Sequence, residues 1–273
     1  MPELPEVESL RRYLVREGIE GKKFIKIEIE NKPESAHGTG TIAGSKQAID
    51  QTVTSIERRG KHLAMVLNNS VLSFHMGMTG QLHVLDPNES FPGFTRAQFD
   101  LTDDNDNLRI ALVDPRRWAR IQHVTSLNHA FAGLGPDALD PAFSTSQFVS
   151  LMVGRTAQIK PLLLDQTVIA GIGNIYADES LHRVEISPAR RVSEISKPEL
   201  EKLFRAIRIS LEHALGYILS HPDDRGRPHI VDAYDDRMQL HRKAGSLCPR
   251  CEILLVTLKF SGRTAYFCSN CQT

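Results

Sequence analysis

The chain has 273 residues, 41% of them hydrophobic and 24% charged, which is typical of a folded globular protein long enough for two domains. Its 33 basic and 33 acidic residues cancel, which argues against a uniformly basic nucleic-acid binder. No run approaches the about 20 apolar residues of a membrane span, and no basic-then-apolar signal peptide opens the chain, so we expect a cytoplasmic protein.

The charge is unevenly distributed along the chain. From residue 237 onward the chain has six basic residues and one acidic residue, Glu252, so this segment has a net charge of +5 and the remainder −5. The basic residues are Arg237, Arg242, Lys243, Arg250, Lys259 and Arg263. A basic end on a neutral chain is compatible with a polyanionic partner and equally with an ordinary solvated surface.

The first half of the chain has the pattern of a helix followed by short strands. Apolar residues at helical spacing predict an amphipathic helix over about 3–17. In "KFIKIEIE" apolar and charged residues alternate, which predicts a half-buried strand with Ile25, Ile27 and Ile29 on one face. Seven further strand-like runs follow up to "ARIQHV", separated by turn signals. This spacing indicates an antiparallel sandwich or barrel.

The second half changes to helical periodicity after "GLGPDALDP". Four helical segments are expected, and Ser196 and Glu199 open the last of them as an N-cap pair. The stretch "HPDDRGRPHIVDAYDDR" has no period and is expected to be a loop. The overall expectation is an α+β chain divided into three parts: 1–135, a β-sandwich domain with an N-terminal helix, 136–236, a helical domain, and 237–273, a cysteine-bearing hairpin.

All four cysteines lie near the C-terminus, as two C-x-x-C pairs separated by 16 residues. They are Cys248, Cys251, Cys268 and Cys271. This spacing predicts one structural Zn²⁺ held by four thiolates, with a pair of disulfides or a redox motif as the alternative. The intervening residues read as two strands whose tip, "FSGRTAYF", carries one cation, Arg263. An arginine on a rigid hairpin is suited to a phosphate, although alone it is more often a solvated turn residue.

Several segments in one order resemble the bacterial formamidopyrimidine-DNA glycosylases, which form one superfamily with the endonuclease VIII enzymes. The segments are "PELPEVE", "RRGKHL", "HMGMTG", "DPRRW", "GLGPDAL", "LLLDQTVIAGIGNIYADE" and the zinc hairpin, and they span Pro2 to Cys271. The set in order is far more specific than any one motif. The resemblance implies that the helical domain is a helix–two-turn–helix element, and that Leu4 points to the formamidopyrimidine branch.

The resemblance gives Pro2 a chemical role. Once Met1 is removed, Pro2 carries a secondary amine, and N-terminal amines have a pKa of about 7.7–8. A neutral fraction of that amine can attack C1′ of a deoxyribose, expel the damaged base and form a Schiff base. With Met1 in place the nitrogen is an amide and has no basicity.

The remaining site residues are implied by the resemblance alone. Glu3 matches the carboxylate that acts as acid and base. Lys61 matches the lysine that acts at the sugar and phosphate. Arg263 matches the arginine that binds phosphate and is linked to δ-elimination. Lesion and DNA contacts are implied for Glu6, Met78, Arg96, Arg116, Trp118, Arg155, Lys160 and Asn174. Met78, Arg116 and Trp118 match the residues that fill the gap left by a flipped base. Without the resemblance, Glu3 and Glu6 read as first-turn helix acids, Lys61 as a strand-edge lysine and Met78 as a core residue.

Two stretches depart from the family pattern. Where the family commonly has an H-x-H pair, this chain has "RAQF", with Arg96 and Gln98. Many members that remove 8-oxoguanine have here a threonine- and tyrosine-bearing loop with a Gly-Gly start, whereas the 221–236 loop of this chain is acidic, shorter and without the Gly-Gly start. The catalytic residues match the family, whereas the base-reading residues do not.

The sequence therefore predicts a bifunctional DNA glycosylase/AP lyase of base-excision repair, acting through a Pro2 Schiff base and β,δ-elimination. The expected partner is double-stranded DNA with damaged bases or abasic sites, and the expected state is a monomer associated with a bacterial nucleoid. Alternatives are an endonuclease VIII-like preference for oxidised pyrimidines or abasic sites, a non-catalytic damaged-DNA-binding protein, and an RNA-binding ribbon protein.

Overall fold

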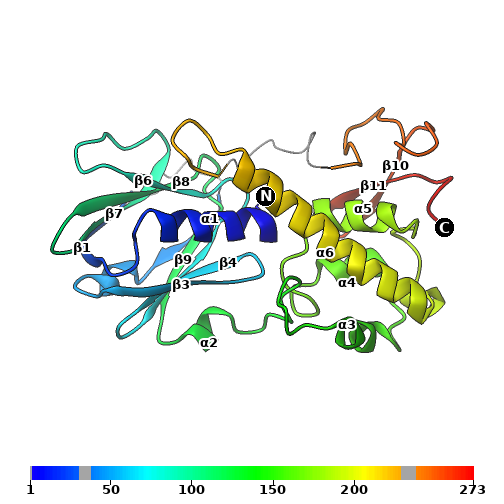
Figure 1. The fold of residues 1–273 in the computed structure, drawn as a ribbon, viewed down its shortest axis with the longest axis horizontal. Coiled ribbons are helices and arrows are strands. Elements are labelled where there is room, and N and C mark those ends of the chain that lie inside the picture. The colour runs from blue at the N-terminus through cyan, green and yellow to red at the C-terminus, as the bar shows by residue number, and fades with distance from the viewer. Residues whose placement is uncertain (1, 31–37, 229–237) are drawn as a thin grey trace. The chain divides into compact units, whose positions relative to one another are not determined.

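The computed structural model describes residues 2–30, 38–228 and 238–273, which form two compact units (Figure 1). The N-terminal unit comprises Met1–Ala132 together with His221–Val231. The C-terminal unit comprises Gly133–Ser220 and Asp232–Thr273. Met1, on whose removal the predicted chemistry depends, lies outside the described residues, as do residues 229–236 of the predicted loop.

Two sheets form the N-terminal unit. One has the order β1-β7-β8-β6, and the other has the order β2-β9-β5-β4-β3. The described strands are β1 Lys23–Ile29, β2 Ile42–Ala43, β3 Val53–Arg59, β4 His62–Leu67, β5 Val71–His75, β6 Gln81–Leu85, β7 Thr95–Thr102, β8 Asn107–Val113 and β9 Arg120–Val124. Their pairings are antiparallel except for the short β2–β9 pair, which is parallel.

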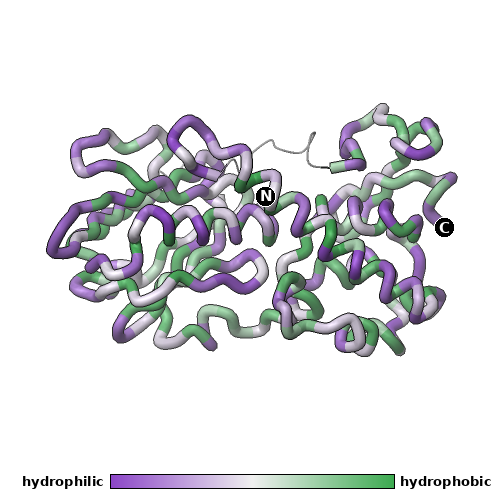
Figure 2. Tube along the Cα trace, viewed as in Figure 1, coloured by the Kyte–Doolittle hydropathy of each residue, from purple (hydrophilic) through white to green (hydrophobic). Residues whose placement is uncertain are grey.

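Helix α1 (Leu4–Arg16) completes the core of this unit. Its buried face, including Leu10 and Leu14, packs in one apolar cluster with residues from both sheets, such as Phe24, Phe74 and Phe99. By contrast, the β7–β8 turn, residues 103–106, is hydrophilic throughout (purple at the left edge of Figure 2). The predicted antiparallel sandwich with an N-terminal helix is confirmed. The short elements η1 (Ser45–Ala48) and α2 (Leu127–Ala130) were not anticipated.

The predicted face of β1 is wrong at one position. Ile25 is 47% exposed, whereas Phe24 and Ile27 are buried. The pairing of β1 with β7 shifts register between Phe24 and Lys26, so Ile25 occupies a bulge. A bulge inserts one residue into the alternation, which brings two residues three positions apart onto the core side.

The C-terminal unit is helical and ends in a small hairpin. Its elements are α3 Thr145–Met152, α4 Ile159–Leu164, α5 Asn174–Arg183, η2 Val192–Glu194, α6 Lys197–Ser220, β10 Val256–Phe260 and β11 Arg263–Phe267. The β10–β11 turn is two residues long, and Ser261 and Gly262 both have positive φ, at 47° and 79°. This conformation matches the twist of a tight hairpin. Among the described helices, none combines the length and apolarity that a bilayer crossing requires.

The turn that follows α6 packs on the N-terminal unit. Arg16 donates to the Gly226 carbonyl at 2.6 Å, and Arg225 forms an ion pair with Glu89. Asp223 accepts hydrogen bonds from both the backbone N–H and the side chain of Arg227, each at 2.8 Å. Residues 221–228 are thus an ordered turn within the stretch that was predicted to be a loop.

Candidate active site and nucleic-acid interface

Pro2, Glu3 and Glu6 gather at the start of α1. Glu3 is the N-cap residue of the helix, Pro2 directly precedes it, and all three are buried. The Glu6 carboxylate accepts a hydrogen bond from the Glu3 backbone N–H at 2.9 Å, which is one half of a capping box. This contact fixes the backbone directly after Pro2.

The turn that carries Lys61 is tied to α1 by one arginine. Arg58, near the end of β3, donates from Nε to the Glu8 carboxylate at 2.9 Å and from Nη1 to the Gly60 carbonyl at 3.1 Å. Lys61 follows Gly60 directly and is 5% exposed. The ion pair therefore links the helix that begins after Pro2 to the residue preceding Lys61.

Glu8 is a buried carboxylate held by three arginines, namely Arg11, Arg12 and Arg58. Burial raises the pKa of Glu8, but hydrogen bonds from the three guanidinium groups more than offset this effect and lower the pKa to about 2. Because the folded pKa is below its unfolded value near 4.5, Glu8 stabilises the fold fully above that value. The contribution is lost as the pH falls from about 4.5 towards 2.

We expect Glu8→Gln to lower the free energy of unfolding at pH 7 by about 2–3 kcal/mol, because the substitution removes a buried carboxylate that is the counter-charge of three arginines, of which Arg58 has a side chain only 10% exposed. Urea unfolding at several pH values measures this difference. The gap between variant and parent should narrow below pH 4.5, and a gap that is equal at pH 7 and pH 3 would contradict the assignment. Glu201→Gln, at an exposed position of α6, is the matched control.

Two histidines lie beside the Lys61 turn. His62 and His75 face each other across β4 and β5, with ring centroids 4.9 Å apart. Burial, followed by the charges of His62 and Lys61, lowers the pKa of His75 to about 4. Burial and Lys61 likewise lower the pKa of His62. Both rings are therefore neutral near pH 7 and add no positive charge beside Lys61.

Two loops of the N-terminal unit carry the residues that we call the wedge set, namely Met78, Arg116 and Trp118. Met78 is 37% exposed, Arg116 is exposed and Trp118 is half-buried. Both loops bond the carboxylate of Asp114, which is fully buried. Its Oδ1 accepts from Thr79 Oγ1 at 2.5 Å and from the Arg116 N–H at 3.3 Å. Its Oδ2 accepts from the N–H groups of Trp118 and Ala119, each at 2.7 Å.

Arg96 and Arg155 have contacts within the chain. Arg96 donates to Glu30 at 2.6 Å and to the Asp114 carbonyl at 2.8 Å, and its side chain is 11% exposed. Arg155 is exposed and donates to the Leu151 carbonyl at 2.7 Å, near the end of α3.

In the C-terminal unit, Lys160 and Asn174 contribute to a set of contacts between the helices and the hairpin strand β11, which begins at Arg263. Lys160 is fully buried and forms an ion pair with Asp178, which also accepts from the Tyr266 N–H at 3.0 Å. Asn174, the first residue of α5, donates to the Thr264 carbonyl at 2.9 Å. These contacts hold the hairpin strand β11 at Thr264 and Tyr266, while Arg263 at its start is exposed.

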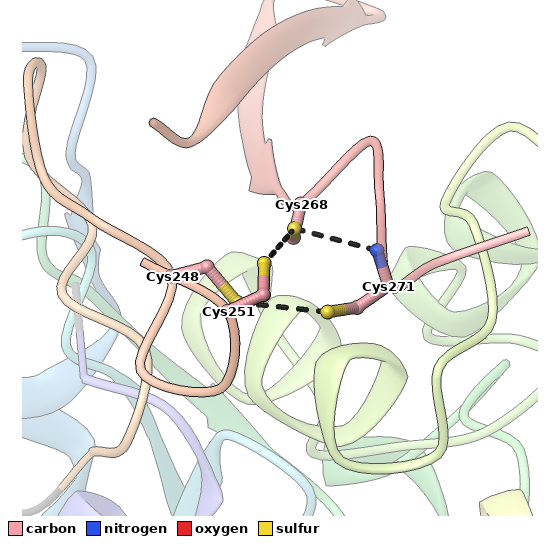
Figure 3. Close-up of side chains that lie close together, drawn as sticks. All are labelled: Cys248, Cys251, Cys268 and Cys271. Atoms are coloured by element: carbon pink, nitrogen blue, oxygen red, sulfur yellow. Dashed lines mark hydrogen bonds between the residues drawn. The ribbon is translucent and has the colours of Figure 1, made fainter. Parts of the chain in front are cut away.

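The four cysteine sulfurs lie within 4.8 Å of one another, and their side chains converge (Figure 3). Cys248 Sγ is 3.9 Å from Cys271 Sγ, and Cys251 Sγ is 3.5 Å from Cys268 Sγ. Thiolates at about 2.3 Å from a tetrahedral Zn²⁺ lie about 3.8 Å apart, and disulfide-bonded sulfurs only about 2.05 Å apart. The four cysteines are free thiols, none of them in a disulfide, and they fit a closed, structural zinc site.

His182 contacts this cluster from α5. The ring is fully buried, and its Nε2 lies 3.4 Å from Cys248 Sγ. Because a metal-bound thiolate has no proton, the imidazole must be the donor in this contact. Such hydrogen bonds orient a ligand and reduce its net charge. His182 thus connects the helical part of the unit to the zinc hairpin.

Replacing His182 by alanine should speed the release of zinc to a chromophoric chelator by about tenfold, the effect expected for a lost partner of a metal ligand. His213→Ala, which removes an exposed histidine of α6, provides the control. A folded His182→Ala chain that releases zinc at the parent rate would rule out the role assigned to this hydrogen bond.

Sequence patterns did not single out Glu8, Asp114, Asp178 or His182. One signal was available for the last two. Positions 174, 178 and 182 are spaced by four, so on a helix they share one face, and all three bear polar side chains. In the structure they contact Thr264, Tyr266 and Cys248, respectively.

Family profiles match nearly all of the chain. Residues 1–121 match "Formamidopyrimidine-DNA glycosylase N-terminal domain", and residues 134–220 match "Formamidopyrimidine-DNA glycosylase H2TH domain". Residues 245–273 match "Zinc finger found in FPG and IleRS". The last match, together with the convergent cysteines, confirms the predicted structural zinc ion.

Curated relatives and solved structures agree with these profiles. Formamidopyrimidine-DNA glycosylases of Pelotomaculum thermopropionicum and Thermomicrobium roseum are 33% and 34% identical, over 100% of this chain and 99% of each relative. The crystal structure of MutM (Fpg) from Thermus thermophilus superimposes with a TM-score of 0.80 at 31% identity, covering 99% of this chain and 98% of that one. A Lactococcus lactis Fpg complex with FAPY-dG-containing DNA gives 0.81 at 27% identity, covering 99% of both chains. The chain therefore belongs to the formamidopyrimidine-DNA glycosylase family, whose members are DNA glycosylases of base-excision repair.

Proposed function

We propose that this glycosylase is bifunctional: it excises oxidised bases from double-stranded DNA through a Pro2 Schiff base and then cleaves the strand by β,δ-elimination. One arrangement carries the proposal. Pro2 and the N-cap Glu3 are buried at the start of α1, and the Glu8–Arg58 ion pair ties that helix to the turn bearing Lys61. The ion pair thus connects the segment that carries the Pro2 nitrogen and the Glu3 carboxylate to the turn that carries the Lys61 amine, within the N-terminal unit.

The first chemical step follows from the basicity of a terminal proline. With Met1 removed, the neutral Pro2 amine attacks C1′, and the bond to the damaged base breaks with its electron pair leaving on the base. Glu3 takes up the proton that the Pro2 nitrogen loses and delivers it to O4′ as the C1′–O4′ bond breaks, while the departing base takes a proton from solvent. The product is an iminium joining Pro2 to the opened sugar.

The iminium then drives strand cleavage. It acidifies the C2′ proton, whose removal expels the 3′ phosphate in β-elimination, and a second elimination expels the 5′ phosphate. We assign Lys61 to the sugar and phosphate at the first elimination and Arg263 to the phosphate at the second. Hydrolysis of the remaining iminium returns the free Pro2 amine.

For DNA binding we propose that the wedge set fills the gap left by the flipped nucleotide, with Glu6 beside the lesion and Arg155 at the backbone. Arg96 can bind a phosphate of the DNA backbone only if its ion pair with Glu30 breaks first. The burial of Lys160 and the contact of Asn174 with Thr264 favour supporting roles, in which both hold the hairpin that presents Arg263.

The solved relatives favour oxidised purines and abasic sites as substrates. Solved structures of relatives are complexes with DNA containing FAPY-dG, carbocyclic 8-oxo-G or an abasic site. An endonuclease VIII-like preference for oxidised pyrimidines is the alternative, because the 221–236 loop departs from the purine-capping pattern. We further propose that the chain works as a monomer on nucleoid DNA.

Duplexes containing formamidopyrimidine, 8-oxoguanine, thymine glycol or a preformed abasic site test the proposal in parallel. We expect excision of formamidopyrimidine ahead of thymine glycol, with cleavage products that carry phosphate at both new ends. Faster excision of thymine glycol would favour the endonuclease VIII-like alternative. Binding to all four duplexes without cleavage of any would favour a non-catalytic damage-binding protein.

A further inference from the structure

The wedge set depends on two loops that are separate in the sequence but share one buried group. Met78 lies between Gly77 and Thr79, and Arg116 and Trp118 lie directly after Asp114 and Pro115. Among the described residues, Asp114 is the side chain that bonds both loops. Thr79 donates to it from one loop, and the N–H groups of Trp118 and Ala119 donate from the other.

Every polar atom of Asp114 is used in this arrangement. Its backbone N–H donates to the Phe94 carbonyl at 3.0 Å, and its carbonyl accepts from the Arg117 N–H at 3.3 Å and from Arg96 Nε at 2.8 Å. The carboxylate accepts four further bonds and is fully buried. A buried anion of this kind is stabilised only while its donors stay in place, so the carboxylate and the loop fix each other.

Three glycine backbones lie close against the same loop. A Cβ added at Gly38 would lie 2.1 Å from the Arg117 carbonyl oxygen, and one at Gly40 would lie 2.2 Å from that of Ala119. At Gly77, which also has a φ of +61°, an added Cβ would lie 2.4 Å from the Trp118 backbone. Arg117 itself has a φ of 57°. Close backbone contact leaves the loop little room for another conformation.

We propose that Asp114 is the positioning residue of the wedge set: one buried carboxylate fixes the Met78 loop and the Arg116–Trp118 loop to each other, so that the three side chains enter DNA as one rigid body. The inference rests on the proposed role of those three side chains in DNA. Asp114 does not touch substrate. It acts through the two loops, and its loss should affect base flipping in a duplex much more than chemistry at an abasic site in a single strand.

Trp118 is the sole tryptophan of the chain, so its fluorescence reports directly on the loop without any DNA. We expect Asp114→Ala to raise acrylamide quenching of Trp118 in the free protein. The same variant should lower base excision from duplex DNA by at least about tenfold, the effect of one lost buried hydrogen-bond partner, while cleavage of a single-stranded abasic site stays near the parent rate. Asp114→Asn should partly restore both properties, because its amide oxygen can still accept from Trp118 and Ala119.

Thr79→Val supplies a milder variant that keeps Asp114 and removes only the bond from the Met78 loop. It should lower duplex excision and leave single-strand cleavage unchanged, whereas Thr102→Val, at the β7–β8 turn, should change neither.

Parent-like quenching and parent-like duplex excision in Asp114→Ala would overturn the proposal. If Asp114→Ala does not fold, parent-like duplex excision by Thr79→Val overturns it. Equal loss of duplex and single-strand activity would also overturn it, because Asp114 would then support the whole domain. Failure of the parent to cleave any DNA would refute the proposed function but leave the fluorescence test of the loop intact.

Discussion

A chain that carries an uncleavable Gly-Ser extension before Pro2 will form no covalent adduct when borohydride is added to its mixture with abasic-site duplex. The extension converts the Pro2 nitrogen into an amide, which has no basic lone pair and cannot attack C1′. We expect trapping and strand cleavage to fall at least about a thousandfold, which corresponds to about 4 kcal/mol of activation free energy. Gel quantification of the adduct measures the effect.

The control is the chain processed to begin at Pro2, with its N-terminus verified by intact mass. Both chains should bind equally well to a duplex containing a tetrahydrofuran abasic analogue, because binding does not require the amine. An extended chain that traps as efficiently as the processed one would show that another amine, such as that of Lys61, is the nucleophile.

Replacing Cys268 by alanine will remove the zinc ion and with it the order of the β10–β11 hairpin. Cys268 is fully buried, and small four-thiolate elements fold only when the metal is bound. Since Arg263 begins β11, the loss of the hairpin removes its fixed position. We expect zinc content to fall to background and duplex cleavage to fall by about a hundredfold. Metal analysis and a strand-cleavage assay measure the two effects.

Two further variants distinguish the effect of losing the zinc ion from the effect of losing the Arg263 side chain. Ser269→Ala changes an exposed neighbour and should retain both zinc and activity. Arg263→Gln should retain zinc but leave products of β-elimination in place of doubly cleaved ends. Full duplex cleavage by a zinc-free Cys268→Ala chain would contradict the structural role given to the ion.

The fold class and the zinc site could be predicted because both depend on repeating or closely spaced residues. Alternation of apolar residues marked the strands, helical spacing marked α1 and the C-terminal helices, and the two C-x-x-C pairs marked the metal cluster. Ile25 shows the limit of such patterns. Its exposure follows from a bulge opposite β7, and the position of a bulge depends on the partner strand rather than on the alternation itself.

The candidate site was predicted only as a set of separate residues. Pro2, Glu3, Lys61 and the wedge set followed from the family resemblance, and their roles remain predictions. The contacts that organise them join residues distant in sequence: Glu8 with Arg58, Thr79 with Asp114, and Lys160 with Asp178. No local pattern encodes such pairs. Lys160 illustrates the consequence, since a lysine implied to contact phosphate is fully buried against an acid.

Peptide mapping of the trapped adduct identifies the nitrogen that attacks C1′. Borohydride reduces the iminium to a stable amine, so digestion and mass spectrometry locate the sugar remnant on one peptide. We expect the remnant on the N-terminal peptide, attached to the Pro2 nitrogen of a chain that has lost Met1. A remnant on the peptide containing Lys61, or on a peptide that still begins with Met1, would contradict it.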